Sequence, residues 1–187
     1  MNIVETAARA TWAVTAEEVK AQGRITGTDE DAYIASLIQR VQEDLEVACD
    51  RAFSDRSLRL TLAAFPARIL LPFAPAKEIT SITYVDQDGV TQTLGPTAYT
   101  LDADAEPAVV VPAYGTSWPS TRAVPAAVTI TYTAGGWGSA RPLPHVYKDA
   151  ILATVVYRFD TREDSGYPQA VLDNLPNLCL WTSYGAQ

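Results

Sequence analysis

The sequence predicts an α+β fold, with helices at both ends of the chain and an antiparallel β-rich insert between them. Apolar residues recur every three or four positions over residues 29–51, which is the period of an amphipathic helix. Over residues 56–133 they instead alternate with polar residues in short runs separated by Gly and Pro, a pattern typical of strands. The pattern then becomes helical again. We therefore predict a small helical bundle, built from residues 1–55 and 142–187, around a β-rich insert at residues 56–141.

Two helices are predicted before the insert. Thr15 and Glu18 have the spacing of a capping box, in which each side chain accepts a hydrogen bond from the other residue's backbone. A short helix should begin there and end at Gly23. Thr28 and the three acidic residues after it form a second cap for a long helix that runs to about Arg51. The apolar stripe of this helix consists of Ile34, Leu37, Ile38, Val41, Leu45 and Ala48.

The insert reads as a series of short antiparallel strands. Asp86-Gln87-Asp88-Gly89 is a turn sequence in which Gly89 supplies a positive φ, so residues 78–94 should form a β-hairpin. Roughly five to seven strands fit the spacing of the turns, in a small sheet or sandwich. The other strands are expected at residues 58–62, 69–71, 99–101, 108–111 and 127–133.

The segment Val128–Trp137 returns the chain from the insert to the last helices. Its β-branched alternation predicts that Ile130 and Tyr132 face the core of the insert. The two glycines that follow, Gly135 and Gly136, allow a sharp turn of the backbone.

Two more helices are predicted after this turn. The first, residues 144–159, begins at Pro144 and is apolar on almost every side, so it must be covered by its own fold or by a partner subunit. A short helix should follow at residues 169–175. The chain then ends on an apolar, aromatic segment, which either docks onto a partner or folds back onto the core. That segment contains Leu178, Leu180, Trp181 and Tyr184.

Composition restricts the possible functions. The net charge of −8 argues against a protein that wraps nucleic acid, because such binding relies on Lys and Arg. No apolar run approaches the ~20 residues that span a bilayer, and the N-terminus has no secretory signal, so we expect synthesis and folding in the cytoplasm. Cys49 and Cys179 are predicted to be reduced, buried thiols. One His and two scattered Cys are too few for a zinc site.

No catalytic constellation emerges, and we predict a protein that is not an enzyme and has no cofactor. Ser117 lies near Gly115 but outside any G-x-S-x-G motif, and only His145 could serve it as a base. A hydrolase around these two residues is therefore the less favoured alternative.

A second alternative is a β-sheet module that binds a ligand or carbohydrate. It would use exposed aromatic side chains of the insert, at Tyr114, Trp118 and Trp137.

The order of the motifs resembles the head–tail connector (adaptor) family of tailed bacteriophages and related gene-transfer particles. The similarity spans about residues 15–160. It rests on the capped long helix that begins Gly27-Thr28-Asp29-Glu30-Asp31-Ala32-Tyr33-Ile34, followed by Leu62–Pro66, Ile79–Asp86, Ser117-Trp118-Pro119, Val128–Gly135 and a Pro-started helix rich in Ala and Ile.

The resemblance implies a structural virion protein located in the particle neck after synthesis in the bacterial host. It would form a homo-oligomeric ring beneath the capsid portal, commonly twelvefold, and provide the attachment surface for a tail-side connector or stopper protein. Double-stranded DNA would pass through the ring without specific binding, and no membrane would be involved.

The same resemblance suggests roles for individual residues. The C-terminal segment would dock into the portal through Leu178, Leu180, Trp181 and Tyr184. Ring neighbours would cover the apolar helix at Ile151, Val155 and Phe159. An acidic channel lining would repel the DNA phosphates, with Asp29, Asp31, Glu43 and Glu46 as candidates.

Overall fold

The computed structural model describes residues 1–137, 141–162 and 166–179, without the side chains of residues 175–178. The chain divides into two units that alternate along the sequence. The β unit comprises residues 1–9 and 55–136, and the helical unit comprises residues 10–54 and 137–187. The predicted α+β fold with antiparallel sheets is confirmed.

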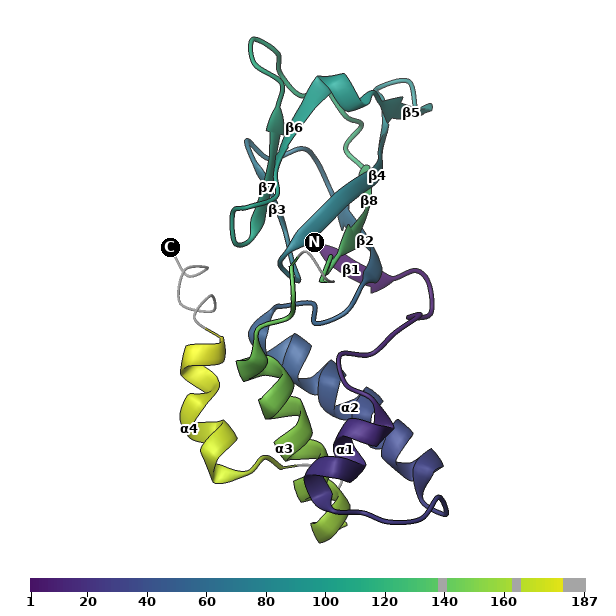
Figure 1. Cartoon of the computed structure of the whole chain (residues 1–187). Helices are drawn as coiled ribbons and strands as arrows, with labels where there is room; N and C mark the ends of the chain where they lie inside the picture. Colours follow the sequence, from purple (N-terminus) through teal and green to yellow (C-terminus); the bar gives the residue numbers. More distant parts are fainter. Residues whose placement is uncertain (138–140, 163–165, 180–187) are drawn as a thin grey trace. The chain divides into compact units, whose positions relative to one another are not determined.

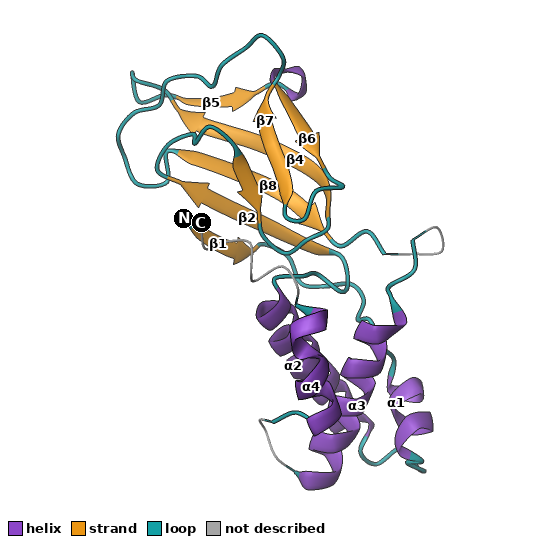
Figure 2. Cartoon of the chain, turned by 90° about the vertical axis from the view of Figure 1, so that its left-hand side faces the viewer, coloured by secondary structure: helices purple, strands orange, loops and turns teal. Residues whose placement is uncertain are grey.

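The β unit contains two antiparallel sheets, which form two layers (Figure 2). The larger has the strand order β1-β2-β8-β4-β5 and the smaller the order β3-β7-β6. Their bounds are β1 Asn2–Glu5, β2 Arg56–Leu62, β3 Ile69–Leu71, β4 Ala76–Val85, β5 Thr91–Leu94, β6 Tyr99–Asp102, β7 Ala108–Pro112 and β8 Val128–Ala134, with a 3₁₀ turn, η1, at Pro96–Ala98.

Strand β8 is the centre of the larger sheet, paired with β2 on one side and β4 on the other. Ile130 and Tyr132 are fully buried, as their alternation predicted. The Tyr132 hydroxyl donates a hydrogen bond of 2.7 Å to the Pro72 carbonyl just after β3. This bond satisfies the one polar atom that the strand places in the core. The turn at Gly89 is confirmed too, with φ of +87°.

The first strand was not predicted. Residues 1–55 were assigned to the helical part, but β1 pairs with β2 from Asn2↔Thr61 to Glu5↔Leu58. An ion pair of 2.8 Å between Glu5 and Arg56 holds the two strands together. Burial alone would raise the pKa of Glu5, but hydrogen bonds from Arg9 and Arg56 outweigh it, and the pKa is lowered.

The helical unit contains α1 (Ala16–Gly23), α2 (Asp31–Cys49), α3 (His145–Thr161) and α4 (Gln169–Leu178), shown in Figure 1. The predicted capping box of α1 is present. Glu18 also pairs with Lys148 of α3, and this contact lowers the pKa of Glu18. The predicted cap of α2 is wrong: its N-cap is Glu30, whose side chain makes no capping hydrogen bond, instead of Thr28. Within the described part of the chain, no helix combines the length and apolar character needed to span a membrane.

The prediction of reduced thiols is also wrong. Cys49, the last residue of α2, forms a disulfide with Cys179, just after α4. The two cysteines lie 130 residues apart in the sequence, so no local pattern could reveal the pairing.

Within each unit, hydrogen bonds join residues that lie next to the points where the chain passes from one unit to the other. In the β unit, Asp55 accepts a bond of 2.6 Å from the Gly136 amide and pairs with Lys77 at 2.9 Å. In the helical unit, the Trp137 indole donates a bond of 2.6 Å to the Ala52 carbonyl. Gly135 and Gly136 have φ of +109° and +81°, so the sharp turn expected there is present.

Candidate interaction surfaces

Two of the three residues predicted to form a ring interface lie inside the helical unit. Ile151 and Val155 are 0% exposed and belong to its apolar core, together with residues of α1 and α2. That part of the prediction is wrong, because a side chain enclosed by its own fold cannot contact a neighbour. Phe159 is half-buried and packs against Tyr33, with ring centroids 6.1 Å apart.

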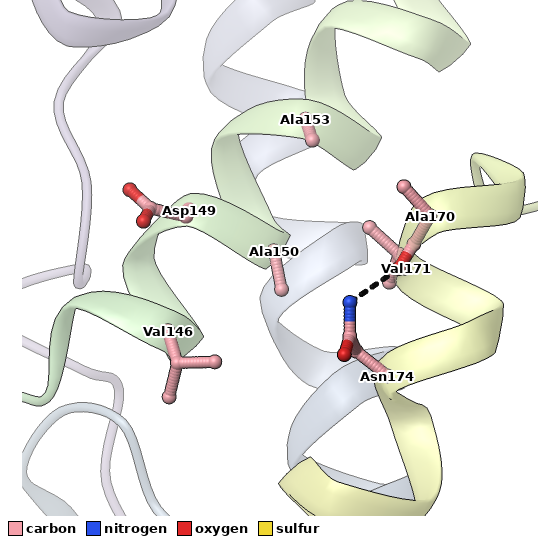
Figure 3. Close-up of a pocket in the computed structure, with 7 residues that line it drawn as sticks. All are labelled: Val146, Asp149, Ala150, Ala153, Ala170, Val171 and Asn174. Carbon is pink, nitrogen blue, oxygen red and sulfur yellow. Dashed lines mark hydrogen bonds between the residues drawn. The ribbon is translucent and has the colours of Figure 1, made fainter.

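The candidate site is instead an apolar groove between α3 and α4, with a volume of about 270 Å³ (Figure 3). Ala150 and Ala153 of α3 face Ala170 and Val171 of α4. Small side chains on both helices leave the space between them unfilled. The remaining lining residues are Val146, Asp149 and Asn174.

One large apolar side chain that lines this groove, Val146, is open to solvent, and so is another apolar side chain of α4, Leu172. Val146, in the first turn of α3, is 50% exposed, and Leu172 on α4 is 43% exposed. The amide of Asn174 is already used, since it donates a hydrogen bond of 2.9 Å to the Ala170 carbonyl. Apart from the exposed carboxylate of Asp149, the groove is therefore suited to an apolar side chain of another molecule.

Arg158 of α3 contacts the segment that leads into α4. It is almost fully buried, donates a hydrogen bond of 3.1 Å from Nε to the Gly166 carbonyl, and lies 5.3 Å from the centre of the Tyr167 ring. Its Nη1 forms an ion pair of 2.9 Å with Asp44 of α2, although the contact lacks hydrogen-bond alignment. Burial, and next the Asp44 charge, raise the pKa of Tyr167. Arg158 is one of four Lys, Arg, Asp or Glu residues of α3, so the sequence alone gives no signal that it is the buried one.

A second apolar groove, of about 360 Å³, lies along α2 in the helical unit. It is lined by residues 10–12 and 14–16 of the segment leading into α1 and by Ala35, Ile38 and Gln39 of α2. Trp12 in this segment is half-buried.

The four predicted channel acids have different surroundings. Glu46 is 0% exposed and accepts hydrogen bonds from the Phe53 amide at 2.7 Å and the Gln42 amide at 2.8 Å. It cannot face an aqueous channel, so this prediction is wrong. Asp31 is paired with Lys20 at 2.6 Å. Asp29 and Glu43 are exposed.

The acidity of the chain is concentrated in the helical unit. This unit holds eight Lys and Arg against fourteen Asp and Glu, whereas the β unit holds six against eight. The surface that would repel a polyanion is therefore mainly the surface of the helical unit.

The aromatic residues of the alternative binding module do not belong to one sheet face. Trp118 stacks on Phe65, with ring centroids 4.8 Å apart, and Tyr114 is exposed. Trp137 belongs to the helical unit, where its indole bonds to Ala52.

The residues of the alternative hydrolase are also divided between the units. Ser117 belongs to the β unit, whereas His145 begins α3 in the helical unit. No group of three or more His, Cys, Asp or Glu among the described residues could hold a metal ion.

The predicted portal-docking segment falls at the edge of what the structure describes. Leu178 ends α4, but its side chain is not described. Leu180, Trp181 and Tyr184 lie outside the described residues. Their role stays a prediction.

Comparison with protein families supports the resemblance predicted from the sequence over part of its span. Residues 14–88 match the family model of phage gp6-like head-tail connector proteins. This stretch contains α1, α2 and the first part of the insert, through the β4–β5 turn. Among curated proteins the sequence has no significant match.

Solved structures of gene transfer agent particles contain a chain with the same fold. A chain in the virion of the native particle matches with a TM-score of 0.77 and 24% identity, over 95% of both chains. A chain in the neck of the empty particle, solved with C6 symmetry, matches with a TM-score of 0.75 and 23% identity, over 95% of both chains. In the neck of the native particle, solved with C12 symmetry, the values are 0.69 and 22% over 94% of both. At these identities the likeness establishes the fold.

Proposed function

We propose that this chain is a head–tail connector, a structural protein in the neck of a phage-like particle that forms a ring beneath the capsid portal. The observation that carries the proposal is the likeness, over nearly the whole chain, to chains in the necks of gene transfer agent particles. The family match over residues 14–88 supports it independently. The ring would extend the DNA channel and present an attachment surface to a tail-side connector or stopper protein.

A closed ring agrees with the surfaces that the helical unit leaves open. In a ring, one surface of each copy contacts a different surface of the next copy. The α3–α4 groove is an apolar surface that remains on α3 after the unit's own core is filled. We therefore assign the copy-to-copy contact to this groove, with Val146 and Leu172 in place of Ile151 and Val155. The C12 and C6 symmetries of the similar necks support a ring of twelve copies.

The acidic surface of the helical unit suits a channel through which DNA slides. Carboxylates repel the phosphate backbone, so DNA passes without being held. Asp29 and Glu43 are exposed and are the candidates for the channel lining. The terminal residues Leu178, Leu180, Trp181 and Tyr184 remain the candidates for contact with the portal, since Trp and Tyr are favoured anchors at interfaces.

Reconstitution with the portal tests this function. Purified full-length protein, mixed with the portal protein of the same particle, should form a complex that elutes early from a sizing column. Electron microscopy should show it as a ring on one face of the portal. If labelled protein in purified particles is found away from the neck, or no complex forms at any protein ratio, the connector assignment is wrong.

A matched pair of variants tests the copy-to-copy contact. Val146→Asp places a charge beside the α3–α4 groove. Val90→Asp places the same charge in the β4–β5 turn, on a residue that is 54% exposed, compared with 50% for Val146. Both variants should remain folded, because neither side chain is buried. Only Val146→Asp should reduce ring formation. Equal behaviour of the two variants would exclude the groove as the contact.

A further inference from the structure

Few of the α4 side chains that the structure describes are buried. The helix is ten residues long, and isolated helices of that length are marginal in water. Of its side chains described, residues 169–174, Val171 is buried and the others are exposed. The described side chains of α4 therefore contribute little burial, and links to other elements become important for holding the helix.

The structure fastens α4 at both ends. At its beginning, Arg158 of α3 bonds to the Gly166 carbonyl and packs on the Tyr167 ring. At its far end, the disulfide joins Cys179 to Cys49 at the end of α2. Linking residues so far apart in sequence strongly restricts the unfolded ensemble of the oxidised chain and favours the ordered state. Once the disulfide is reduced, this covalent link no longer holds the far end of α4.

We propose that the Cys49–Cys179 pair is a redox-controlled clasp, which holds α4 on the helical unit when oxidised and lets it detach when reduced. Thiols in a reducing cytoplasm stay reduced, whereas disulfides persist in oxidising surroundings. The chain would thus fold with a loosely held α4, and α4 would become fixed once the chain meets an oxidant. This inference concerns the order of one helix and stands whether or not the chain is a connector.

The chemistry requires an oxidant, and a low-molecular-weight disulfide such as oxidised glutathione supplies it. The thiolate of one cysteine attacks a sulfur of the small disulfide, the bond between its two sulfurs breaks, and one small thiol is released. The second cysteine then attacks the mixed disulfide and releases the second small thiol. The protein loses two electrons and two protons, and the two released thiols carry them.

The clasp also affects the groove and the chain end. Ala170, Val171 and Asn174 form the α4 wall of the groove, so this wall is fixed only while α4 is held. The disulfide also anchors residue 179, from which residues 180–187 continue. Because Cys49 is fully buried and Cys179 nearly so, a reductant reaches the bond only when α4 opens locally.

Hydrogen exchange of the full chain in reduced and in oxidised glutathione tests the clasp. Upon reduction, amides of residues 167–179 should exchange about tenfold faster or more, because the link that orders them is lost. Amides of α2 and of the β unit should be unaffected. Cys179→Ser should show the fast exchange of α4 in both buffers. Cys49→Ala removes the other cysteine of the disulfide and, as a second variant, should show the same fast exchange.

Three results would overturn the clasp. One is that mass spectrometry finds free thiols after incubation with oxidised glutathione. Another is that α4 exchanges equally fast in both buffers. The last is that reduction accelerates exchange throughout the helical unit, which would make the disulfide a general staple of that unit and not a clasp on α4.

Discussion

At the scale of single residues, hydrogen bonds of buried polar side chains connect separate segments of the helical unit. Gln42 accepts a hydrogen bond of 2.8 Å from the Ala13 amide and donates to Glu46 and to Ser54. Glu46 in turn accepts from the Phe53 amide. This network connects the segment before α1, helix α2 and the turn after it. Buried polar groups persist in a core only when they are paired in this way.

Replacing Glu46 with Ala should therefore destabilise the protein by about 1–3 kcal/mol, because the Phe53 amide and the Gln42 side chain lose an acceptor. Urea unfolding followed by circular dichroism measures the change. Glu43→Ala, on the exposed face of the same helix, is the matched control and should change stability by less than about 0.5 kcal/mol. Equal effects of the two substitutions would contradict the assigned burial of Glu46.

Asp55 provides a pH-dependent test. Burial alone would raise the pKa of Asp55, but hydrogen bonds from Lys77 and from the Gly136 amide outweigh it, so the pKa lies below the ordinary 3.8. A carboxylate with a lowered native pKa stabilises the fold above its ordinary pKa, and the effect disappears as the pH falls through the native value.

Asp55→Asn should therefore lower the thermal unfolding midpoint at pH 7, and the difference from the wild type should shrink as the pH falls below 3.8. Scanning calorimetry at pH 7 and pH 3 measures both differences. Asp88→Asn, in the exposed β4–β5 turn, should have little effect at pH 7. A difference between wild type and Asp55→Asn that does not depend on pH would contradict the proposed role of the Asp55 charge.

At the scale of elements, the alternation of apolar and polar residues along strand β8 places one face of the strand in the core. Val128, Ile130 and Tyr132 are buried, whereas Thr129 and Thr131 on the opposite face are partly exposed. Both neighbouring strands bury the residues opposite Ile130, which are Leu60 and Ile82. The core of the β unit thus depends on rows of apolar residues across three strands.

Ile130→Ala should cost about 2–5 kcal/mol, because it removes buried methyl groups and leaves a cavity that the sheet cannot close. Thr131→Ala, one residue along the same strand, should cost less than about 1 kcal/mol. Denaturant unfolding midpoints of the two variants would test this ordering. A reversed order would mean that the register of β8 is wrong.

Elements defined by short-range signals could be predicted, and those that depend on distant partners could not. The capping residues Thr15 and Glu18 lie within one helical turn, and so the start of α1 was readable from the sequence. Strand β1 was missed because Asn2–Glu5 has too few residues to show a period and its partner lies more than fifty positions away.

The candidate site was less predictable for a similar reason. An all-apolar helix such as α3 does not reveal which side its own core will cover, and so Ile151 and Val155 were assigned to a ring interface. Glu46 has the residue type of an exposed helix face, but the turn at residues 50–53 brings a backbone amide to it. Local sequence does not record such contacts.

At the scale of the whole molecule, the chain passes three times between the two units. Two of these crossings, before Asp55 and after Gly136, are adjacent in space, because the Asp55–Gly136 bond joins them in the β unit. In the helical unit, the Trp137–Ala52 bond does the same. The helical unit should therefore fold without the β unit.

A chain that begins at Ala10 and joins Ser54 to Trp137 through a short Gly linker should keep the helical circular dichroism signal. It should also unfold cooperatively, because the apolar core of the unit remains complete. Loss of cooperative unfolding would mean that the helical unit depends on the β unit for its stability.

The disulfide gives the oxidised chain two covalent routes between residues 49 and 179, one along the backbone and one through sulfur. The whole segment 55–136 of the β unit lies within the loop that they close. A protease cut in the exposed β4–β5 turn would therefore leave the two fragments joined, and they would separate on a gel only after reduction. A nicked chain would thus remain a single covalent piece until the disulfide is reduced.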